Sequence, residues 1–477
     1  MIGYTTPQAA GISEQAIQGF LKELKRRELN MHSVIMLKGN DIFFEKYTAP
    51  FTADMPHRMY SVTKTFVSIA IGCLLDEGKI TLDDPIVKYF PDKQPETIHP
   101  YMAEQTIRNM LMMSTCYQGF NWFLPGVVDR TAFYFAQQPN RPAGTLFDYD
   151  STGSYILGAL VERLSGMTLL EYLKEKVLNR IGGFDNAQML QVPDGVAWGD
   201  SAMICTPRAL MNFARFVMNY GTWEGERLLS ESYLKEATSP LTTNDLECRN
   251  GYNFHGYGYQ IWCNEQDGFS FHGMGGQYAI CIPKKDFIFV CTGDNQYNPL
   301  ASEILFRAVF DYLIPEEAEE PDEDWQLSAA HGEAFSDFEN KIQGKTFICD
   351  ENTMGIRKFR FEFTGEQGTL IYENAQGEKI LPFGRTTNWF GKFPQLGYSD
   401  QFGNVHDITD FKYDCASSGG WIEPQKIQLR VQIIDRYFGS TTMTFGFRDE
   451  NTVGIRMTKI AEDFLSEYTG WAGAHAE

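Results

Sequence analysis

MYSVTKTFVSIAIGC, residues 59–73, places a serine and a lysine three positions apart at the start of an apolar run. Residues three apart share one face of a helix, so Lys64 would lie over the Ser61 hydroxyl. The run after Lys64 is apolar nearly all round, which predicts a buried helix over 62–77. A lysine in the first turn of a buried helix needs a partner or a chemical role.

Two interpretations of this pattern compete, a catalytic serine and a helix cap. A serine hydroxyl becomes a nucleophile only with a base within hydrogen-bond reach, and a buried amine is a candidate base because burial disfavours its charged form. The pattern alone favours the cap, since Ser232-Tyr-Leu-Lys235 repeats it at what resembles an ordinary exposed helix start. Other segments of the sequence are needed to distinguish the catalytic serine from the helix cap.

The N-terminal part mixes helical and strand periodicities. Helices are predicted over 13–27, 62–77, 106–113, 152–165, 168–176, 207–219 and 300–313, and strands over 31–37, 41–47, 257–262, 268–274, 277–283 and 286–293. Two strands near the beginning and four near the end, with helices between them, indicate one antiparallel sheet flanked by helices and interrupted by a helical insertion. This arrangement is the α+β class.

A different pattern follows the acidic segment EEAEEPDED, residues 316–324. Like charges together with proline resist packing, so residues 316–337 are predicted to link a domain over 1–315 to a second over 338–477. The second part alternates apolar and polar residues, as in Ile427, Leu429, Val431 and Ile433. Such alternation predicts an antiparallel, lipocalin-like β-barrel or a sandwich.

Composition excludes several classes of function. The net charge of −21 over 477 residues argues against a nucleic-acid partner. The eight histidines are dispersed and HExxH is missing, so we expect neither a metal site nor a cofactor. Nine dispersed cysteines, no apolar run near the roughly 18 residues of a membrane span, and no secretory signal favour a cytoplasmic protein without membrane insertion. Oligomeric state stays open.

Three ordered segments carry a family resemblance that covers about residues 10–314. They are MYSVTKTFVSIAIGCLLDEGKITLDDPIVKYF (59–90), RPAGTLFDYDSTGSYILGALVERLSG (141–166) and FSFHGMGGQYAICIPKKDFIFVCTGDN (269–295). Together they resemble the penicillin-recognising serine hydrolases, in the branch of class C β-lactamases, D-aminopeptidases and esterases. The resemblance implies a β-lactamase/transpeptidase-like fold and reverses the preference for a helix cap at Ser61.

The resemblance also implies roles for residues. Ser61 would attack a carbonyl and form an acyl-enzyme, while Lys64 and Tyr149 would share the proton. Backbone N–H groups of Ser61 and of the strand near 272–275 would stabilise the oxyanion.

Departures from the family pattern bear on the substrate. Ser151 stands where the family has Asn, and the third segment has no Lys-Thr-Gly, with His272 the nearest substitute and Gly273 and Met274 beside it. The cation that binds a substrate carboxylate is therefore expected to be weak or missing.

Aromatic residues after position 116 provide candidates for an acyl pocket. Tyr117 and Trp122 are proposed to contact the substrate, although core packing explains them as well. The sequence predicts a serine hydrolase acting on an ester or amide of a small molecule or short peptide rather than on penicillins. A non-catalytic penicillin-binding-like sensor, and a genuine class C-type β-lactamase or D-amino-acid peptidase, remain the alternatives.

Overall fold

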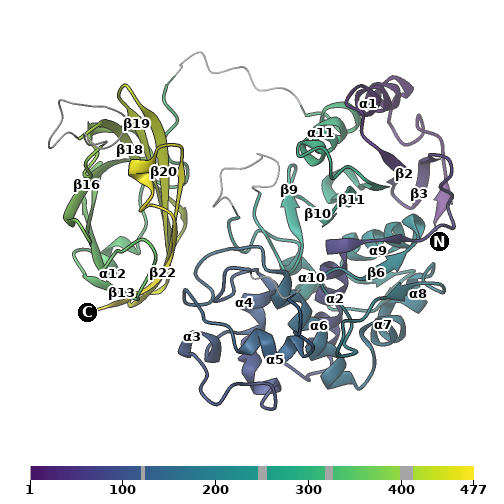
Figure 1. Cartoon of the computed structure of the whole chain (residues 1–477). Coiled ribbons are helices and arrows are strands. Elements are labelled where there is room, and N and C mark those ends of the chain that lie inside the picture. The colour runs from purple at the N-terminus through teal and green to yellow at the C-terminus, as the bar shows by residue number, and fades with distance from the viewer. Residues whose placement is uncertain (1, 120–123, 245–254, 317–325, 398–411) are drawn as a thin grey trace.

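The computed structural model describes residues 2–119, 124–244, 255–316, 326–397 and 412–477. Within them the chain forms a sheet covered by helices and, after residue 346, a β-barrel (Figure 1). The expected fold class, an antiparallel sheet flanked by helices followed by an antiparallel barrel, is confirmed. None of the helices among the described residues is both long enough and apolar enough to cross a bilayer.

In the part of the chain that the structure describes, the first sheet has seven strands in the order β1-β3-β2-β12-β11-β10-β9. They are β1 Gly3–Tyr4, β2 Met31–Lys38, β3 Asp41–Tyr47, β9 Trp262–Asn264, β10 Gly268–Gly273, β11 Gln277–Ile282 and β12 Phe287–Gly293. All neighbours are antiparallel except β1 and β3. Strands from both ends of this part therefore meet at the β2–β12 pairing, as the sequence predicted.

Helices cover both faces of this sheet. α1 Glu14–Arg26 and α11 Ala301–Ala308, which continues into η6 Val309–Leu313, enclose one apolar core. On the other face lie α2 Thr63–Asp76, α6 Ser151–Ser165 and α9 Pro207–Met218, around a larger core. The remaining elements of this part are β4 His57–Arg58, η1 Tyr60–Val62, η2 Ile86–Tyr89, α3 Pro100–Ala103, α4 Ile107–Leu111, α5 Arg130–Phe135, α7 Leu169–Leu173, η3 Lys174–Leu178, α8 Asn179–Ile181, β5 Gln188–Met189, β6 Met203–Cys205, β7 Thr222–Trp223, β8 Glu226–Arg227, α10 Glu231–Ala237 and η5 Pro283–Lys285.

The helix α2 lies at the centre of the larger of these two cores. It is buried from Thr63 to Leu74, and each fully buried large apolar side chain stabilises the fold by about 1.5–3 kcal/mol. Gly72 allows close packing, because a Cβ there would lie 2.6 Å from the Tyr233 ring. The apolar sequence after Lys64 thus forms a helix whose position is fixed on all sides.

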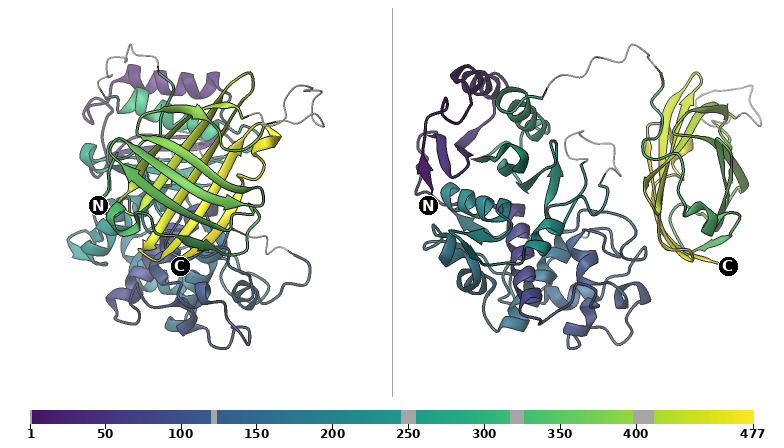
Figure 2. Two further views of the ribbon diagram at one scale, coloured as in Figure 1. Left: turned by 90° about the vertical axis from the view of Figure 1, so that its left-hand side faces the viewer. Right: turned by 180° about the vertical axis from the view of Figure 1, so that it is seen from behind.

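Among its described residues, the barrel is a ring of nine strands with one further strand, β17, paired outside the ring. Its elements are α12 Glu339–Ile342, β13 Phe347–Cys349, β14 Lys358–Thr364, β15 Gln367–Asn374, β16 Gly377–Arg385, β17 Trp389–Lys392, β18 Asp414–Glu423, β19 Lys426–Ile434, β20 Phe438–Asp449, β21 Thr452–Ile460, η7 Asp463–Leu465 and β22 Gly470–Ala476. A parallel pairing of β16 with β18 closes the ring. Figure 2 shows its strands running obliquely to one another around the barrel.

Aromatic side chains fill the barrel interior. Phe359, Phe361 and Phe445 are buried in mutual contact, with ring centroids 4.9–5.9 Å apart. The alternation read from the sequence places Leu429 and Val431 in the same core. This barrel is therefore packed inside by its own side chains.

The predicted linker lies partly beyond what the structure describes, since residues 317–325 are outside the described residues. Further on, the chain runs along the barrel wall. Leu327 O accepts from Asn388 Nδ2 at 2.7 Å, and Ala330 N donates to Ser418 Oγ at 2.8 Å. The domain boundaries stay a prediction.

Candidate active site

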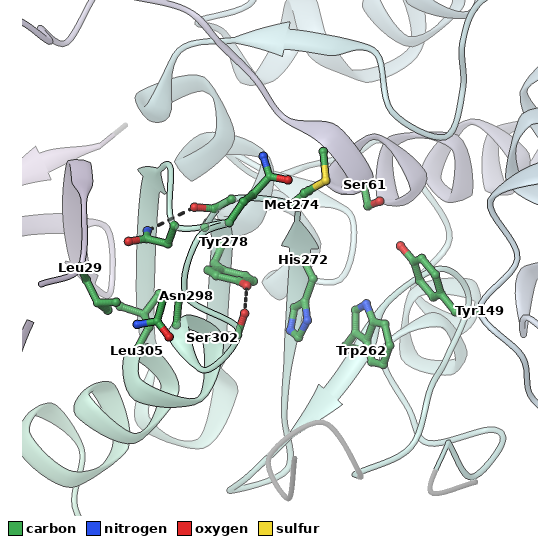
Figure 3. Close-up of a pocket in the computed structure, with 16 residues that line it drawn as sticks. Leu29, Ser61, Tyr149, Trp262, His272, Met274, Tyr278, Asn298, Ser302 and Leu305 are labelled. Carbon is green, nitrogen blue, oxygen red and sulfur yellow. Dashed lines mark hydrogen bonds between the residues drawn. The ribbon is translucent and has the colours of Figure 1, made fainter. Parts of the chain in front are cut away.

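Ser61 lies at the start of α2, in the short helical turn η1. The preceding residue, Tyr60, has a φ of 48°, so the chain turns sharply just before the serine. A non-glycine residue in this left-handed region costs about 1–3 kcal/mol, which the surrounding packing must offset. The turn exposes the Ser61 side chain to a cavity of about 290 Å³ (Figure 3).

Lys64 lies one helical turn further on and is 1% exposed. Its Nζ donates to Ser61 Oγ at 2.9 Å and to the backbone carbonyl of Asp200 at 2.8 Å. The carbonyl contact holds the amine beneath the serine. The spacing Ser-x-x-Lys therefore produces the hydrogen bond that the sequence predicted.

The second Ser-x-x-Lys copy provides a contrast. Ser232 and Lys235 lie in α10, and both are exposed. Lys235 Nζ pairs with Glu231 Oε1 at 2.7 Å. This copy is a surface helix start, as its sequence context indicated.

Tyr149 enters the site from the segment that precedes α6. Its hydroxyl is directed towards Ser61 across the cavity (Figure 3). Lys64 Nζ lies 5.1 Å from the centroid of the Tyr149 ring, and the ring stacks on Trp262 at 5.4 Å between centroids. Ser61, Lys64 and Tyr149, from two segments of the chain, thus meet at one point.

Asp150, next to Tyr149, has a structural role. Its Oδ1 accepts from Thr152 N at 2.8 Å and caps α6, and its Oδ2 accepts from Thr115 Oγ1 at 3.0 Å. Ser151, the proposed counterpart of the family Asn, is the first residue of α6 and does not line the cavity among the described residues.

His272 lies on β10 and lines the cavity with Gly273 and Met274. Its Nε2 shares a hydrogen bond with Ser270 Oγ at 2.7 Å, and its ring stacks on Trp262 at 5.1 Å. Burial among these groups lowers the pKa of His272 to about 3, so the imidazole is uncharged at neutral pH.

Gly273 is required by close approach. A Cβ there would lie 2.3 Å from the backbone oxygen of Met59, just before the Ser61 turn. The end of β10 therefore packs directly against the turn that carries the serine. Met274 follows at the mouth of the cavity and is 51% exposed.

The structure describes only one of the two aromatic residues that were proposed to contact the substrate. Tyr117 is 2% exposed, belongs to the core around α2, and its hydroxyl donates to Tyr134 O at 3.0 Å. It does not line the cavity among the described residues. Trp122 lies outside the described residues.

Sequence reasoning missed several residues of the site. Trp262 stacks on both Tyr149 and His272. The cavity is also lined by Leu29, Asn295, Gln296, Asn298, Ala301, Ser302 and Leu305. Asp200 supplies the backbone carbonyl that accepts from Lys64. Leu29, Asp200 and Trp262 come from separate segments of the chain, whereas the other residues lie together at 295–305, at and beyond the end of the third resembling segment.

The electrostatics of the cavity are simple. None of the side chains that line it among the described residues is Asp, Glu, Lys or Arg. Below it, Asp200 is 6% exposed, and burial raises the pKa of its carboxyl to about 6. The part of the chain that the structure describes holds no group of three or more His, Cys, Asp or Glu placed to hold a metal ion.

Comparisons with known proteins show a family match. The chain matches the family described as Beta-lactamase over residues 14–311. It is 23% identical over 310 residues to the 6-aminohexanoate-dimer hydrolase of Paenarthrobacter ureafaciens, covering 60% of this chain and 78% of that protein.

Solved structures show the same fold. The octameric penicillin-binding protein homologue from Pyrococcus abyssi has a TM-score of 0.51 and 17% identity, over 96% of this chain and 99% of that one. EstCE1, a hydrolase with promiscuous acyltransferase activity, has a TM-score of 0.51 and 13% identity, over 62% and 97% of the two chains. Because the family match spans more than half of the sequence and contains all three predicted motifs, the chain belongs to the Beta-lactamase family, within the serine β-lactamase and penicillin-binding-protein-like superfamily.

Proposed function

We propose that the protein hydrolyses an uncharged ester or amide through an acyl-enzyme on Ser61. The observation that carries the proposal is the meeting of Ser61, Lys64 and Tyr149 at one cavity with an uncharged lining. The relative named a 6-aminohexanoate-dimer hydrolase and the structural neighbour named a hydrolase with acyltransferase activity support a hydrolytic role for this framework.

The proposed first step is acylation. Lys64 Nζ acts as the base and takes the proton of Ser61 Oγ over the 2.9 Å contact while Oγ bonds to the substrate carbonyl carbon. The carbonyl electron pair moves onto oxygen, where N–H groups of Ser61 and of the Gly273–Gly275 turn would stabilise it. When the intermediate collapses, the Tyr149 hydroxyl gives its proton to the leaving oxygen or nitrogen and regains one from Lys64.

The second step is deacylation. A water molecule attacks the acyl carbon, and its proton passes along the same groups in reverse. The bond from Ser61 Oγ to the acyl carbon breaks, Oγ regains its proton, and a carboxylic acid leaves. The two steps together consume one water per ester or amide bond.

The cavity supports an uncharged substrate. Leu29 and Leu305 provide apolar surface at its far end, and Asn295 and Asn298 provide amide groups. His272 is neutral and supplies no cation for a carboxylate such as that of a penicillin. Ester or amide hydrolysis is therefore favoured over β-lactam hydrolysis.

Active-site labelling tests the proposal. A fluorophosphonate is expected to label the wild-type protein and the control Ser232→Ala, but not Ser61→Ala. The control removes the serine of the exposed second Ser-x-x-Lys copy. Absence of labelling in the wild type would contradict the acyl-enzyme proposal.

Two further measurements separate the alternatives. A fluorescent penicillin is expected to label weakly or not at all, and strong labelling with turnover would favour a genuine β-lactamase. Labelling of Ser61 without turnover of nitrophenyl esters would favour a sensor. Tyr149→Phe is expected to lower ester turnover by about 100-fold or more, in the range of general acid–base catalysis.

A further inference from the structure

The outer wall of the barrel carries an unusual row of glycines. Gly446, Gly454 and Gly473 lie opposite one another on the neighbouring strands β20, β21 and β22. Glycine weakens a strand and often marks a place where another backbone approaches closely. None of the three has a positive φ, so the conformation of the chain does not require glycine there.

Close contact with the first part of the chain explains this row. A Cβ on Gly446 would lie 2.2 Å from the backbone oxygen of Thr145, and one on Gly454 would lie 2.3 Å from Thr145 Oγ1. At Gly473 a Cβ would lie 2.4 Å from the Tyr101 hydroxyl. Thr145 stands four residues before Tyr149. The barrel therefore packs against the segment that carries the proposed catalytic tyrosine.

A buried cation–aromatic cluster continues the same face. Arg456 and Trp471 are paired across β21 and β22, two residues beyond Gly454 and Gly473. The guanidinium carbons of Arg141 and Arg456 lie 4.0 Å and 4.6 Å from the centroid of the Trp471 ring.

Arg141 belongs to the same segment as Thr145. It is fully buried, donates to Asn140 Oδ1 at 2.9 Å and to Tyr117 O, and lies 3.7 Å from Asp148 Oδ2. Burial lowers the pKa of Arg141 to about 10 and raises that of Asp148. A buried guanidinium contacts an aromatic face favourably, so Trp471 of the barrel contributes directly to the stability of this segment.

Packing leads from Trp471 to the catalytic tyrosine. Trp471 shares a buried cluster with Leu146 and Phe147, and the Phe147 ring lies 6.1 Å from that of Trp262. Trp262 in turn stacks on Tyr149. Residues 136–150 contain neither helix nor strand. Backbone hydrogen bonds from Asn140, Gly144 and Asp148 to residues 113–116 hold one side of the segment, and side-chain packing against Trp471 holds the other.

Resting on the acyl-enzyme mechanism proposed above, we propose that the barrel is a positioning part of the active site. Through Gly446, Gly454 and Trp471 it holds the 141–149 segment so that the Tyr149 hydroxyl stays at Ser61. The packed interior of the barrel is consistent with this role. Because side chains fill the interior, the outer wall makes the contacts with the 141–149 segment.

Ester turnover by Trp471→Ala tests the proposal. The variant is expected to lower kcat by about 10- to 100-fold, since a misplacement of about 1 Å can cost 100-fold, and to change KM little. Trp471→Phe should recover part of the loss. Phe438→Ala, at a 74% exposed position on the same barrel, is the control and should behave as wild type.

A glycine pair supplies a second test that does not remove a large side chain. Gly446→Ala introduces the clash with Thr145, whereas Gly439→Ala on the same strand meets nothing closer than 3.2 Å. The first should lower kcat and the second should not. Circular dichroism and thermal unfolding verify that each variant is folded.

A double-mutant cycle separates positioning from a merely structural effect. If Trp471 acts through Tyr149, Trp471→Ala should change kcat by less than about 2-fold once Tyr149 is replaced by Phe. Losses that multiply in the double variant, or a folded Trp471→Ala with wild-type kcat, would overturn the inference. Normal turnover by Tyr149→Phe itself would instead refute the proposed function.

Discussion

Replacing Asp200 by Asn should make the stability of the protein less dependent on pH. The carboxyl is buried, and its Oδ1 has no hydrogen-bond partner among the described residues. Burial raises the pKa of Asp200 to about 6, while the nearby Lys64 and Arg130 side chains act in the opposite direction. Asn keeps the size of the side chain and removes its ionisation.

The magnitude follows from the pKa change. A rise from 3.8 in the unfolded chain to about 6 in the folded protein corresponds to about 3 kcal/mol. The folded state holds the proton more tightly, so the contribution of Asp200 to the free energy of unfolding falls as pH rises between these values. Above about pH 6 the full cost is present, and the Asp200→Asn variant avoids it.

The assay is urea unfolding of both proteins at several pH values from about 4 to 7. The difference in unfolding free energy should grow by about 3 kcal/mol in favour of Asp200→Asn across this range. If packing of the amide adds a constant amount to the unfolding free energy, the pH dependence of the difference is unchanged. The control is Asp54→Asn, at an exposed position. A difference that stays flat would refute the argument that Asp200 is buried in its charged form at neutral pH.

Other predictions concern the base, the core and the histidine. Lys64→Met should lower the rate of fluorophosphonate labelling by about 100- to 10,000-fold, and an unchanged rate would remove Lys64 as the base. Gly72→Ala should destabilise the protein by about 1–3 kcal/mol in thermal unfolding, because the clash with Tyr233 outweighs the helix preference of alanine; a stabilised variant would contradict the packing. Since the pKa of His272 is lowered to about 3, the pH profile of kcat/KM for His272→Asn should match wild type between about pH 5 and 8. Loss of a limb near pH 6.5 would show that the imidazole titrates in the active enzyme.

Local patterns in the sequence were sufficient for the principal helices and strands. The apolar run after Lys64 predicted α2, and alternation predicted the strand β19. The spacing of Ser61 and Lys64 predicted their hydrogen bond, because residues three apart on a helix are neighbours whatever the rest of the fold does. Tyr149 required the family resemblance as well, since it lies far from Ser61 in sequence.

Other features of the site depend on contacts between distant segments. The Asp200 carbonyl that holds Lys64 is 136 positions away in the chain, and Trp262 has no motif around it. The sequence predicted Tyr117 as a pocket residue, but its side chain packs in the core around α2. The charge of His272 is likewise a property of its burial and not of its spacing.

The sequence by itself determined the closeness of Ser61 and Lys64, the helix that carries them and the two kinds of sheet, because short-range periodicity sets these features. Only the tertiary structure decided which residues surround the serine, that the cavity is uncharged, and that a glycine row on the barrel meets the Tyr149 segment. The physical reason is that burial and close contact arise from packing between segments hundreds of residues apart, which no local pattern encodes.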